Sequence, residues 1–298
     1  MLSNSQEKEV SLLLRLAGRL PTNWIHAFGS LRGRNPWIKR ATDWIPNRIR
    51  AREGVIQRGV AQGLRFNGGN SATGFLLGTH DPNIQRALEL LIKPGMVVYD
   101  VGANVGFTAI ICAHLAGAKG RVICFEPQPK CDEMIRHNAA INGFGQIQVR
   151  NEALGGENGS ARFLVTNDST FSRLAGSGKP DSGAREIDVP VRRLDALITD
   201  HALPKPDVIK IDVEGAEAPM LEGAMATLRD AKPVLLIELH GTNKVVSDAL
   251  TKAGYTTRVL GGPEGILDAH WNALVIGVPP NRPDLEGVLG RLTQSIAG

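Results

Sequence analysis

The chain has 298 residues, which is enough for one large domain or for a domain with an appendage. Hydrophobic residues make up 42% of it and charged residues 21%, as in an ordinary soluble globular protein. The net charge of +4 is small for this length and does not by itself indicate a nucleic-acid-binding protein.

The number of cysteines and the length of the apolar runs further limit the class of protein. The chain has three cysteines and no CxxC pair, so neither a zinc knuckle nor a redox pair is indicated. This scarcity favours a reducing compartment, and we expect a cytoplasmic protein. No run of about 18 apolar residues predicts a membrane-spanning helix. The segment Met1–Val10 is polar and acidic, unlike a secretory signal peptide.

Residues 1–53 are predicted to form an N-terminal helical appendage. Within it, Val10–Leu20 has the pattern of a short amphipathic helix, which Pro21 would end. Three tryptophans and seven basic residues then occur between Asn23 and Arg52. Such a stretch could contact an anionic membrane surface or a partner protein. The alternative is a helical cap on the main domain whose basic residues are solvated.

From residue 54 onward, candidate strands and helices alternate. A hairpin is predicted over residues 54–67, and an irregular or strand segment over 71–79. Further strands are predicted over residues 97–101, 122–125, 146–150, 160–165, 186–192, 208–212, 233–239, 255–260 and 271–278. Helices are predicted over residues 81–91, 106–115, 129–142, 194–201, 217–228, 243–253 and 285–296. The Gly/Ser-rich segment 167–183 is expected to be a mobile surface loop.

This alternation predicts an α/β fold with a doubly wound, mainly parallel sheet. We expect the main domain to cover residues 54–278, with its core starting at about residue 81. A C-terminal tail would cover residues 279–298. No internal repeat is evident, and the oligomeric state is left open.

The segment from Val97 to Phe107 is the most informative in the chain. A β-branched strand ends at Asp100-Val101, and a turn with Gly102, Asn104 and Gly106 leads into a helix. Such a turn presents backbone N–H groups at a helix N-terminus. The glycines would let a ligand approach the backbone, and Asn104 suits a left-handed conformation.

The acids after successive strands indicate which ligand this turn binds. The G-x-G-x-x-G spacing of a dinucleotide site is absent, and Asp100 would repel a pyrophosphate but suit a sulfonium. Glu126 ends the next strand, where a carboxylate can accept both ribose hydroxyls. Glu152 ends the third strand and could accept from an adenine amino group. Together these acids favour S-adenosylmethionine over NAD.

Longer motifs resemble the FkbM-type S-adenosylmethionine-dependent methyltransferases. The matching segments are Lys93-Pro94-Gly95, Tyr99–Gly106, Phe125-Glu126-Pro127, Asn138, Asn142, Leu194-Asp195 and, above all, Ile209–Glu217. The resemblance spans about residues 54–278 and does not reach residues 1–53. It implies a class I methyltransferase fold, with a seven-stranded sheet whose last strand is antiparallel. It also implies O-methylation of a hydroxyl on a sugar, glycan, polyketide or related metabolite.

The cofactor site is assigned to residues of the three strand ends. These residues are Asp100, Gly102, Asn104, Gly106, Phe107, Glu126, Pro127, Glu152 and Ala153, together with Asp212. No nucleic acid is expected as a partner; the expected partner is a small-molecule or glycan acceptor.

The catalytic residues are assigned to the ends of two later strands. Methyl transfer to an alcohol needs an aligned nucleophile and a group that removes its proton. Asp212 and Glu214 follow one strand, which also carries Lys210, and His240 follows the next. His240 is the natural general base because its ordinary pKa is near neutrality. Asp212 could orient it, bind the acceptor hydroxyl or cap the following helix.

Three alternatives stay open at this point. Asp212, Glu214, Glu238 and His240 could bind a divalent cation such as magnesium or calcium, which we consider the weaker interpretation of these residues. The whole chain could instead be an NAD-dependent oxidoreductase, although the third glycine is missing. It could also be a non-catalytic scaffold that retains the fold.

Overall fold

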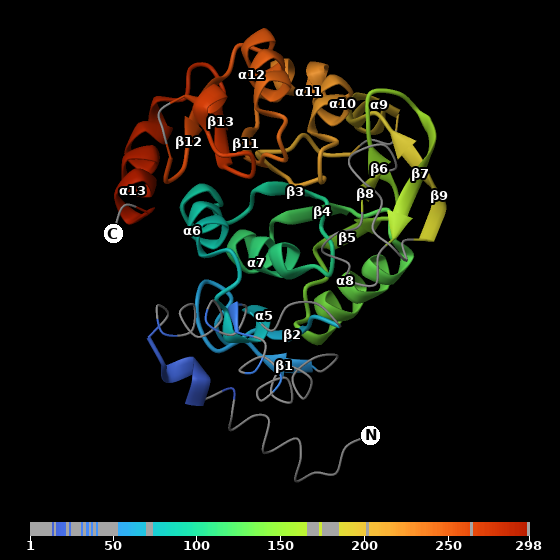
Figure 1. Cartoon of the computed structure of the whole chain (residues 1–298). Helices are drawn as coiled ribbons and strands as arrows, with labels where there is room; N and C mark the ends of the chain where they lie inside the picture. Colours follow the sequence, from blue (N-terminus) through green and yellow to red (C-terminus); the bar gives the residue numbers. More distant parts are fainter. Residues whose placement is uncertain are drawn as a thin grey trace. The chain divides into compact units, whose positions relative to one another are not determined.

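The computed structural model of the protein describes residues 53–69, 74–165, 173–174, 185–200, 203–262 and 265–296, with scattered residues between 14 and 40. The chain divides into two compact units, Met1–Pro82 and Asn83–Gly298 (Figure 1). Most of the predicted appendage 1–53 lies outside the described residues, and so does the predicted loop 167–183, apart from Arg173–Leu174. The predicted division into domains stays a prediction.

The first unit contains the predicted hairpin. Strands β1 (Glu53–Val55) and β2 (Arg65–Asn67) pair antiparallel. The segment predicted as irregular or strand instead contains a short helix, α5 (Gly74–Leu77), so that prediction was wrong there. Its neighbouring apolar residues Phe75 and Leu76 are both buried. Successive side chains of a strand point to opposite faces, whereas on a helix they diverge by only about 100°, so a helical turn buries both.

The second unit is built on a seven-stranded sheet in the order β12-β13-β11-β10-β3-β4-β5. Its strands, in chain order, are β3 (Val97–Val101), β4 (Arg121–Phe125), β5 (Ile147–Arg150), β10 (Val208–Ile211), β11 (Val234–Glu238), β12 (Thr256–Val259) and β13 (Leu274–Val278). Strand β13 runs antiparallel to both of its neighbours, and the other pairings are parallel. This arrangement confirms the class I methyltransferase fold.

Strand order also explains where a ligand can bind. The first strand of the sheet, β3, lies between β4 on one side and β10 on the other. The chain order therefore reverses at β3 and β10, which is the switch point where open α/β sheets bind ligands at the carboxyl ends of the strands. The Gly turn follows β3, and Asp212 follows β10, so both occupy this point.

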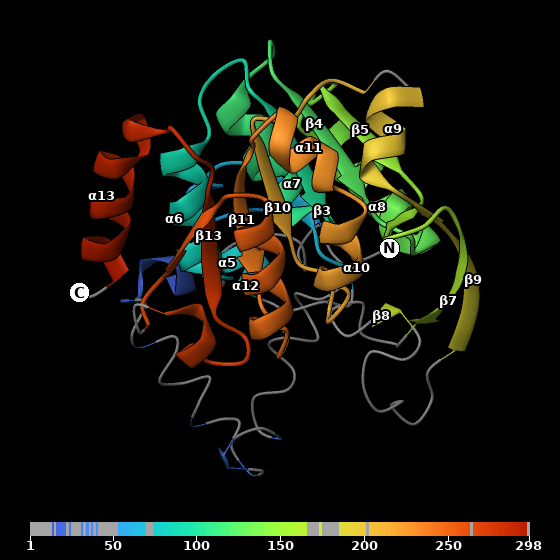
Figure 2. The ribbon, with the colours of Figure 1, turned by 90° about the horizontal axis from the view of Figure 1, so that it is seen from above.

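Helices cover the sheet on both faces (Figure 2). One face packs against α9 (Leu194–Asp200), α10 (Glu217–Glu222), α11 (Met225–Asp230) and α12 (Asn243–Lys252) through a core that includes Tyr99, Ile209, Leu221 and Leu250. Helix α7 (Phe107–Ala116) contacts β3 and β4, and α8 (Pro129–Ile141) contacts β5. Helices α6 (Pro82–Leu91) and α13 (Glu286–Ile296) form where the sequence predicts them.

Two features differ from the sequence-based expectation. The strands β6 (Ala153–Leu154), β7 (Gly159–Val165), β8 (Arg173–Leu174) and β9 (Arg185–Arg192) form a separate four-stranded sheet.

The helix expected over 217–228 is broken at Gly223-Ala224 into α10 and α11. The side chain of Asp195, on α9, accepts hydrogen bonds from the backbone N–H groups of Ala226 and Thr227 at 3.0 and 2.8 Å. It thereby caps a new helix N-terminus, which a local pattern cannot predict.

Candidate functional site

The Gly turn after β3 has the left-handed conformations that its sequence predicts. Asn104 has φ of 49°, Gly102 of 78° and Gly106 of 86°. The reason for glycine differs from the prediction, because a Cβ atom on Gly102 would overlap the carbonyl oxygen of Asp212. A Cβ on Gly106 would lie 3.1 Å from Ile135 of α8. The Asp212 carbonyl thus requires glycine at position 102, and the positive φ together with the close Ile135 favours glycine at position 106.

Glu126, which follows β4, holds this turn in place. Its Oε2 accepts a hydrogen bond from the Asn104 N–H at 2.8 Å, and its Oε1 accepts one from the Gln128 N–H at 2.9 Å. The side chain is only 6% exposed. Burial raises the pKa of Glu126 to about 7, against the opposing effect of the two backbone hydrogen bonds. Each oxygen keeps a further lone pair with which a carboxylate can accept a hydroxyl of a ligand.

Asp100 and Lys210 form an ion pair inside the sheet. They are register partners on β3 and β10, with Lys210 Nζ 3.4 Å from Asp100 Oδ1. The same Nζ lies 3.2 Å from Asp212 Oδ2 and donates to the Gly102 carbonyl at 3.2 Å. Burial raises the pKa of Asp100, and the charge of Lys210 opposes this effect. Burial lowers the pKa of Lys210, but the charges of Asp212 and Asp100 outweigh burial, so the pKa of Lys210 is raised overall. Lys210 therefore ties the Gly turn to Asp212, and Asp100 is fully buried beside it.

The other predicted cofactor residues are buried at the same edge of the sheet. Phe107 begins α7, and Pro127 and Ala153 follow the ends of β4 and β5. Glu152 is 7% exposed and forms ion pairs with Arg150 and, at 3.8 Å, with Arg192. Two arginines thus already neutralise this carboxylate, and its contact with an adenine amino group stays a prediction.

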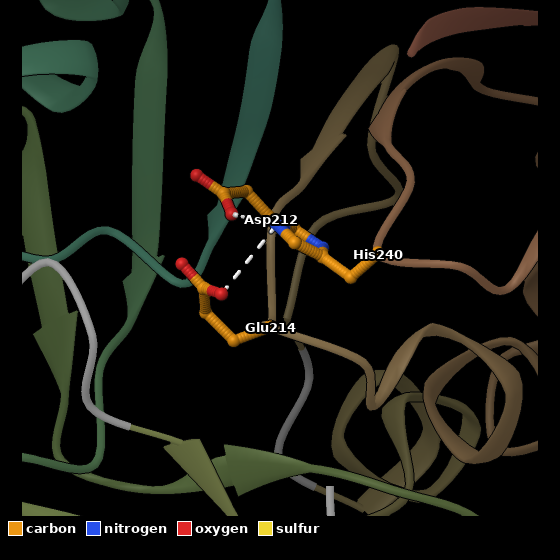
Figure 3. Close-up of side chains that lie close together, drawn as sticks. All are labelled: Asp212, Glu214 and His240. Atoms are coloured by element: carbon orange, nitrogen blue, oxygen red, sulfur yellow. Dashed lines mark ion pairs between the residues drawn. The ribbon is translucent and has the colours of Figure 1, made fainter. Parts of the chain in front are cut away.

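The predicted catalytic residues converge after β10 and β11. The Nε2 atom of His240 lies 3.7 Å from Asp212 Oδ1 and 3.6 Å from Glu214 Oε2 (Figure 3). The three side chains offer ligand atoms that all lie within 4.8 Å of one another. Glu214 has φ of 51°, a conformation that is uncommon for a residue other than glycine and that often marks a functional loop.

Glu217 is a site residue that the sequence-based assignment missed. It is fully buried, and its Oε1 lies 2.8 Å from His240 Nδ1. Thr242 Oγ1 donates to the other oxygen at 3.0 Å, and the Gly215 N–H donates to Oε1 at 3.2 Å. Since an ionised carboxylate only accepts, Nδ1 of His240 carries the proton and Nε2 faces Asp212 and Glu214. The one indication in the sequence that Glu217 belongs to the site was its place in the motif Ile209–Glu217, which resembles the FkbM family.

The environment of His240 changes its acid–base chemistry. Burial lowers its pKa, but the hydrogen bond with Glu217 and the charges of Asp212, Glu217 and Glu214 outweigh burial and raise it to about 9. His240 is therefore an imidazolium at neutral pH in this state of the protein. The assignment of His240 as general base started from its ordinary pKa near neutrality, and in the folded chain the pKa lies above that value.

Two further motif residues have structural roles in the second unit. Asn138 is fully buried, and its amide donates to the Val105 carbonyl at 2.9 Å, which ties α8 to the Gly turn. Asp195 caps α11, and its Oδ1 also accepts from Thr227 Oγ1 at 2.7 Å. These contacts explain why residues far from the strand ends belong to the same motif set.

The sheet order and the strand-end residues are those of the class I methyltransferase fold. A family model described as the methyltransferase FkbM domain matches residues 100–256, and the chain belongs to this family. This confirms the resemblance seen in the sequence. Within the described residues, none of the helices is long and apolar enough to cross a membrane.

Individual relatives are about 30% identical to this chain over the aligned residues. Hexuronic acid methyltransferase AglP of Haloferax volcanii is 29% identical over 167 residues, which are 55% of this chain and 64% of the relative. The 2-O-methyltransferase NoeI of Sinorhizobium fredii is 30% identical over 157 residues, 48% of this chain and 63% of the relative. The chain thus matches slightly less than two thirds of each relative.

Among solved structures, a methyltransferase FkbM from Methylobacillus flagellatus aligns with a TM-score of 0.43 and 16% identity. The alignment covers 69% of this chain and 55% of that one.

Proposed function

We propose that this protein transfers the methyl group of S-adenosylmethionine to a hydroxyl of a sugar or glycan. The observation that carries the proposal is the contact between two loops at the switch point of the sheet. Gly102 of the Gly turn packs directly against the carbonyl of Asp212, and Lys210 bonds to both residues. A nucleoside held by the Gly turn and Glu126 would therefore lie next to the cluster of Asp212, Glu214 and His240.

The chemistry of the transfer fits these two neighbouring parts. The acceptor oxygen attacks the methyl carbon, and a C–O bond forms while the S–C bond breaks. The bonding pair goes to sulfur, which leaves S-adenosylhomocysteine as a neutral thioether. The hydroxyl proton must depart during the transfer, and we propose that a carboxylate of the cluster accepts it and passes it to solvent.

The acceptor class is supported by the relatives. One acts on a hexuronic acid by its name, and the other is named a 2-O-methyltransferase. A sugar hydroxyl is therefore the acceptor we propose first, with polyketides and related metabolites as the wider class. The cytoplasmic location expected from the sequence stays a prediction, as does membrane contact through residues 1–53.

The test is transfer of a labelled methyl group. The purified chain would be incubated with methyl-labelled S-adenosylmethionine and an extract of the cells that produce it. We expect label in a compound that releases a methylated monosaccharide on acid hydrolysis. A Glu126→Gln variant should lose most of this transfer. Glu186→Gln, which changes an exposed carboxylate on β9, serves as the matched control. Label in protein or nucleic acid, or none above the level without enzyme, would contradict the proposal.

A further inference from the structure

We propose that Asp212, Glu214 and His240 bind one divalent transition-metal cation of the Mn²⁺ or Zn²⁺ type. The three donors come from two loops: Asp212 and Glu214 follow β10, and His240 follows β11 (Figure 3). Binding of the cation itself is independent of the proposed function, whereas its role in methyl transfer rests on that function.

The spacing of the donor atoms matches a cation-sized gap. Two ligands at about 2.1 Å from a metal lie about 3.4 Å apart at tetrahedral angles and about 3.0 Å apart at right angles. The distances from His240 Nε2 to the Asp212 and Glu214 oxygens are 3.7 and 3.6 Å, longer than hydrogen bonds. Small side-chain adjustments would therefore place all three atoms on one ion.

The orientation of His240 comes from a residue outside the donor set. Glu217 accepts the Nδ1 proton at 2.8 Å, and Thr242 and the Gly215 N–H hold Glu217 in turn. The Nε2 atom is thereby directed at the two carboxylates, and a bound cation would take the place of its proton. A buried carboxylate behind an imidazole in this way is the usual support of a metal-binding histidine.

Formal charge supports the same conclusion. Four carboxylates lie around the cluster, and within the described part of the chain Lys210 pairs with two of them. The carboxylates are Asp100, Asp212, Glu214 and Glu217. Lys210 lies against the first two, and His240 lies against Asp212, Glu214 and Glu217. A divalent cation, a proton on His240 or the sulfonium of a bound donor could supply positive charge here, and binding experiments separate these sources.

The donor types select the kind of cation. Magnesium and calcium favour sites made of oxygen alone, whereas one imidazole and two carboxylates suit manganese, iron or zinc. This differs from the sequence-based alternative, which included Glu238 and pointed to magnesium or calcium. Three protein ligands leave open positions for an acceptor hydroxyl. The cation would lower the pKa of that hydroxyl, and the proton would pass to solvent before the oxygen takes the methyl group.

The experiment is a calorimetric titration of the full chain, without a histidine tag and stripped of metal by a chelator. Mn²⁺ and Zn²⁺ are titrated separately. We expect one site per chain for at least one of the two ions. Glu214→Gln and His240→Asn should each weaken it at least tenfold. Glu217→Gln should weaken it by about ten- to a hundredfold by releasing His240. Asp248→Asn, which removes an exposed carboxylate on α12, should leave it unchanged.

Circular dichroism of each variant establishes that it is folded. Glu214→Gln changes a partly exposed side chain on a loop and is therefore the variant least coupled to the core. No saturable binding of either ion by the wild-type chain, or equal binding by wild type and Glu214→Gln, would overturn the inference. Titration with S-adenosylhomocysteine on the same samples separates the two proposals. If it binds and the metals do not, His240 or a carboxylate acts without a metal, and the proposed methyl transfer still stands.

Discussion

Replacing Gly102 with alanine tests the contact that joins the Gly turn to Asp212. The new Cβ would overlap the Asp212 carbonyl oxygen and lie 2.9 Å from its carbon and 3.5 Å from Val213 Cγ1. The backbone of Asp212 cannot rotate away from the new Cβ as a flexible side chain could. A positive φ costs a residue with Cβ about 1–2 kcal/mol, and an overpacked contact typically adds about 1–3 kcal/mol or more. We therefore expect Gly102→Ala to lose about 2–5 kcal/mol of unfolding free energy.

Gly95→Ala is the matched control. Gly95 has φ of 89°, close to that of Gly102, but a Cβ there meets nothing within 4 Å. It should lose only the conformational term of about 1–2 kcal/mol, so the difference between the two variants isolates the contact with Asp212.

Thiol labelling measures the unfolding of the relevant unit. The three cysteines of the chain, Cys112, Cys124 and Cys131, are all buried and all lie in the second unit. A pulse of a thiol reagent at increasing urea concentrations therefore reports that unit alone, and the free energy follows by linear extrapolation. If the two variants agree within about 1 kcal/mol, the close approach of the two loops is refuted.

Three further predictions concern other parts of the site. Burial raises the pKa of Glu126 to about 7 in the ligand-free protein, and in our proposal its carboxylate form accepts the ribose hydroxyls. The affinity for S-adenosylhomocysteine should therefore fall by up to about tenfold per unit as the pH drops below 7, and calorimetry should find no such dependence in Glu126→Gln. Lys210→Met leaves Asp100 buried without its cation, so thiol labelling should show a loss of about 3–5 kcal/mol; a change below about 1 kcal/mol would disprove the pairing. Asp195→Ala removes the cap of α11 and should cost about 1–3 kcal/mol in the same assay while leaving the affinity for S-adenosylhomocysteine unchanged; a lost affinity would show that Asp195 contributes to the site.

Much of the fold and the position of the site followed from local patterns. Strands such as Val97–Val101 are short apolar runs that end in polar residues, and carboxyl ends of parallel strands meet at one edge of a sheet. That rule alone brought Asp212 and His240 together from residues 28 positions apart in the chain. The left-handed turn at Asn104 also followed from its residue type.

Pairings across the fold could not be predicted in this way. Asp100 pairs with Lys210, and this pairing is set by the register of β3 and β10. Glu217 lies in the first turn of a helix, where an acid normally favours the helix N-terminus, so its bond to His240 had no local signal. The break between α10 and α11 depends on Asp195, 31 positions before the residue it caps. These contacts depend on tertiary structure, and local periodicity does not record them.

Calorimetric titration of the purified chain with S-adenosylhomocysteine, and separately with NADH, tests the central claim most directly. We predict that S-adenosylhomocysteine binds at one site per chain, that NADH does not bind, and that Glu126→Gln weakens the binding. Protection of the three thiols shows that the protein is folded. If such folded protein binds NADH in place of S-adenosylhomocysteine, or binds neither ligand, the account is contradicted.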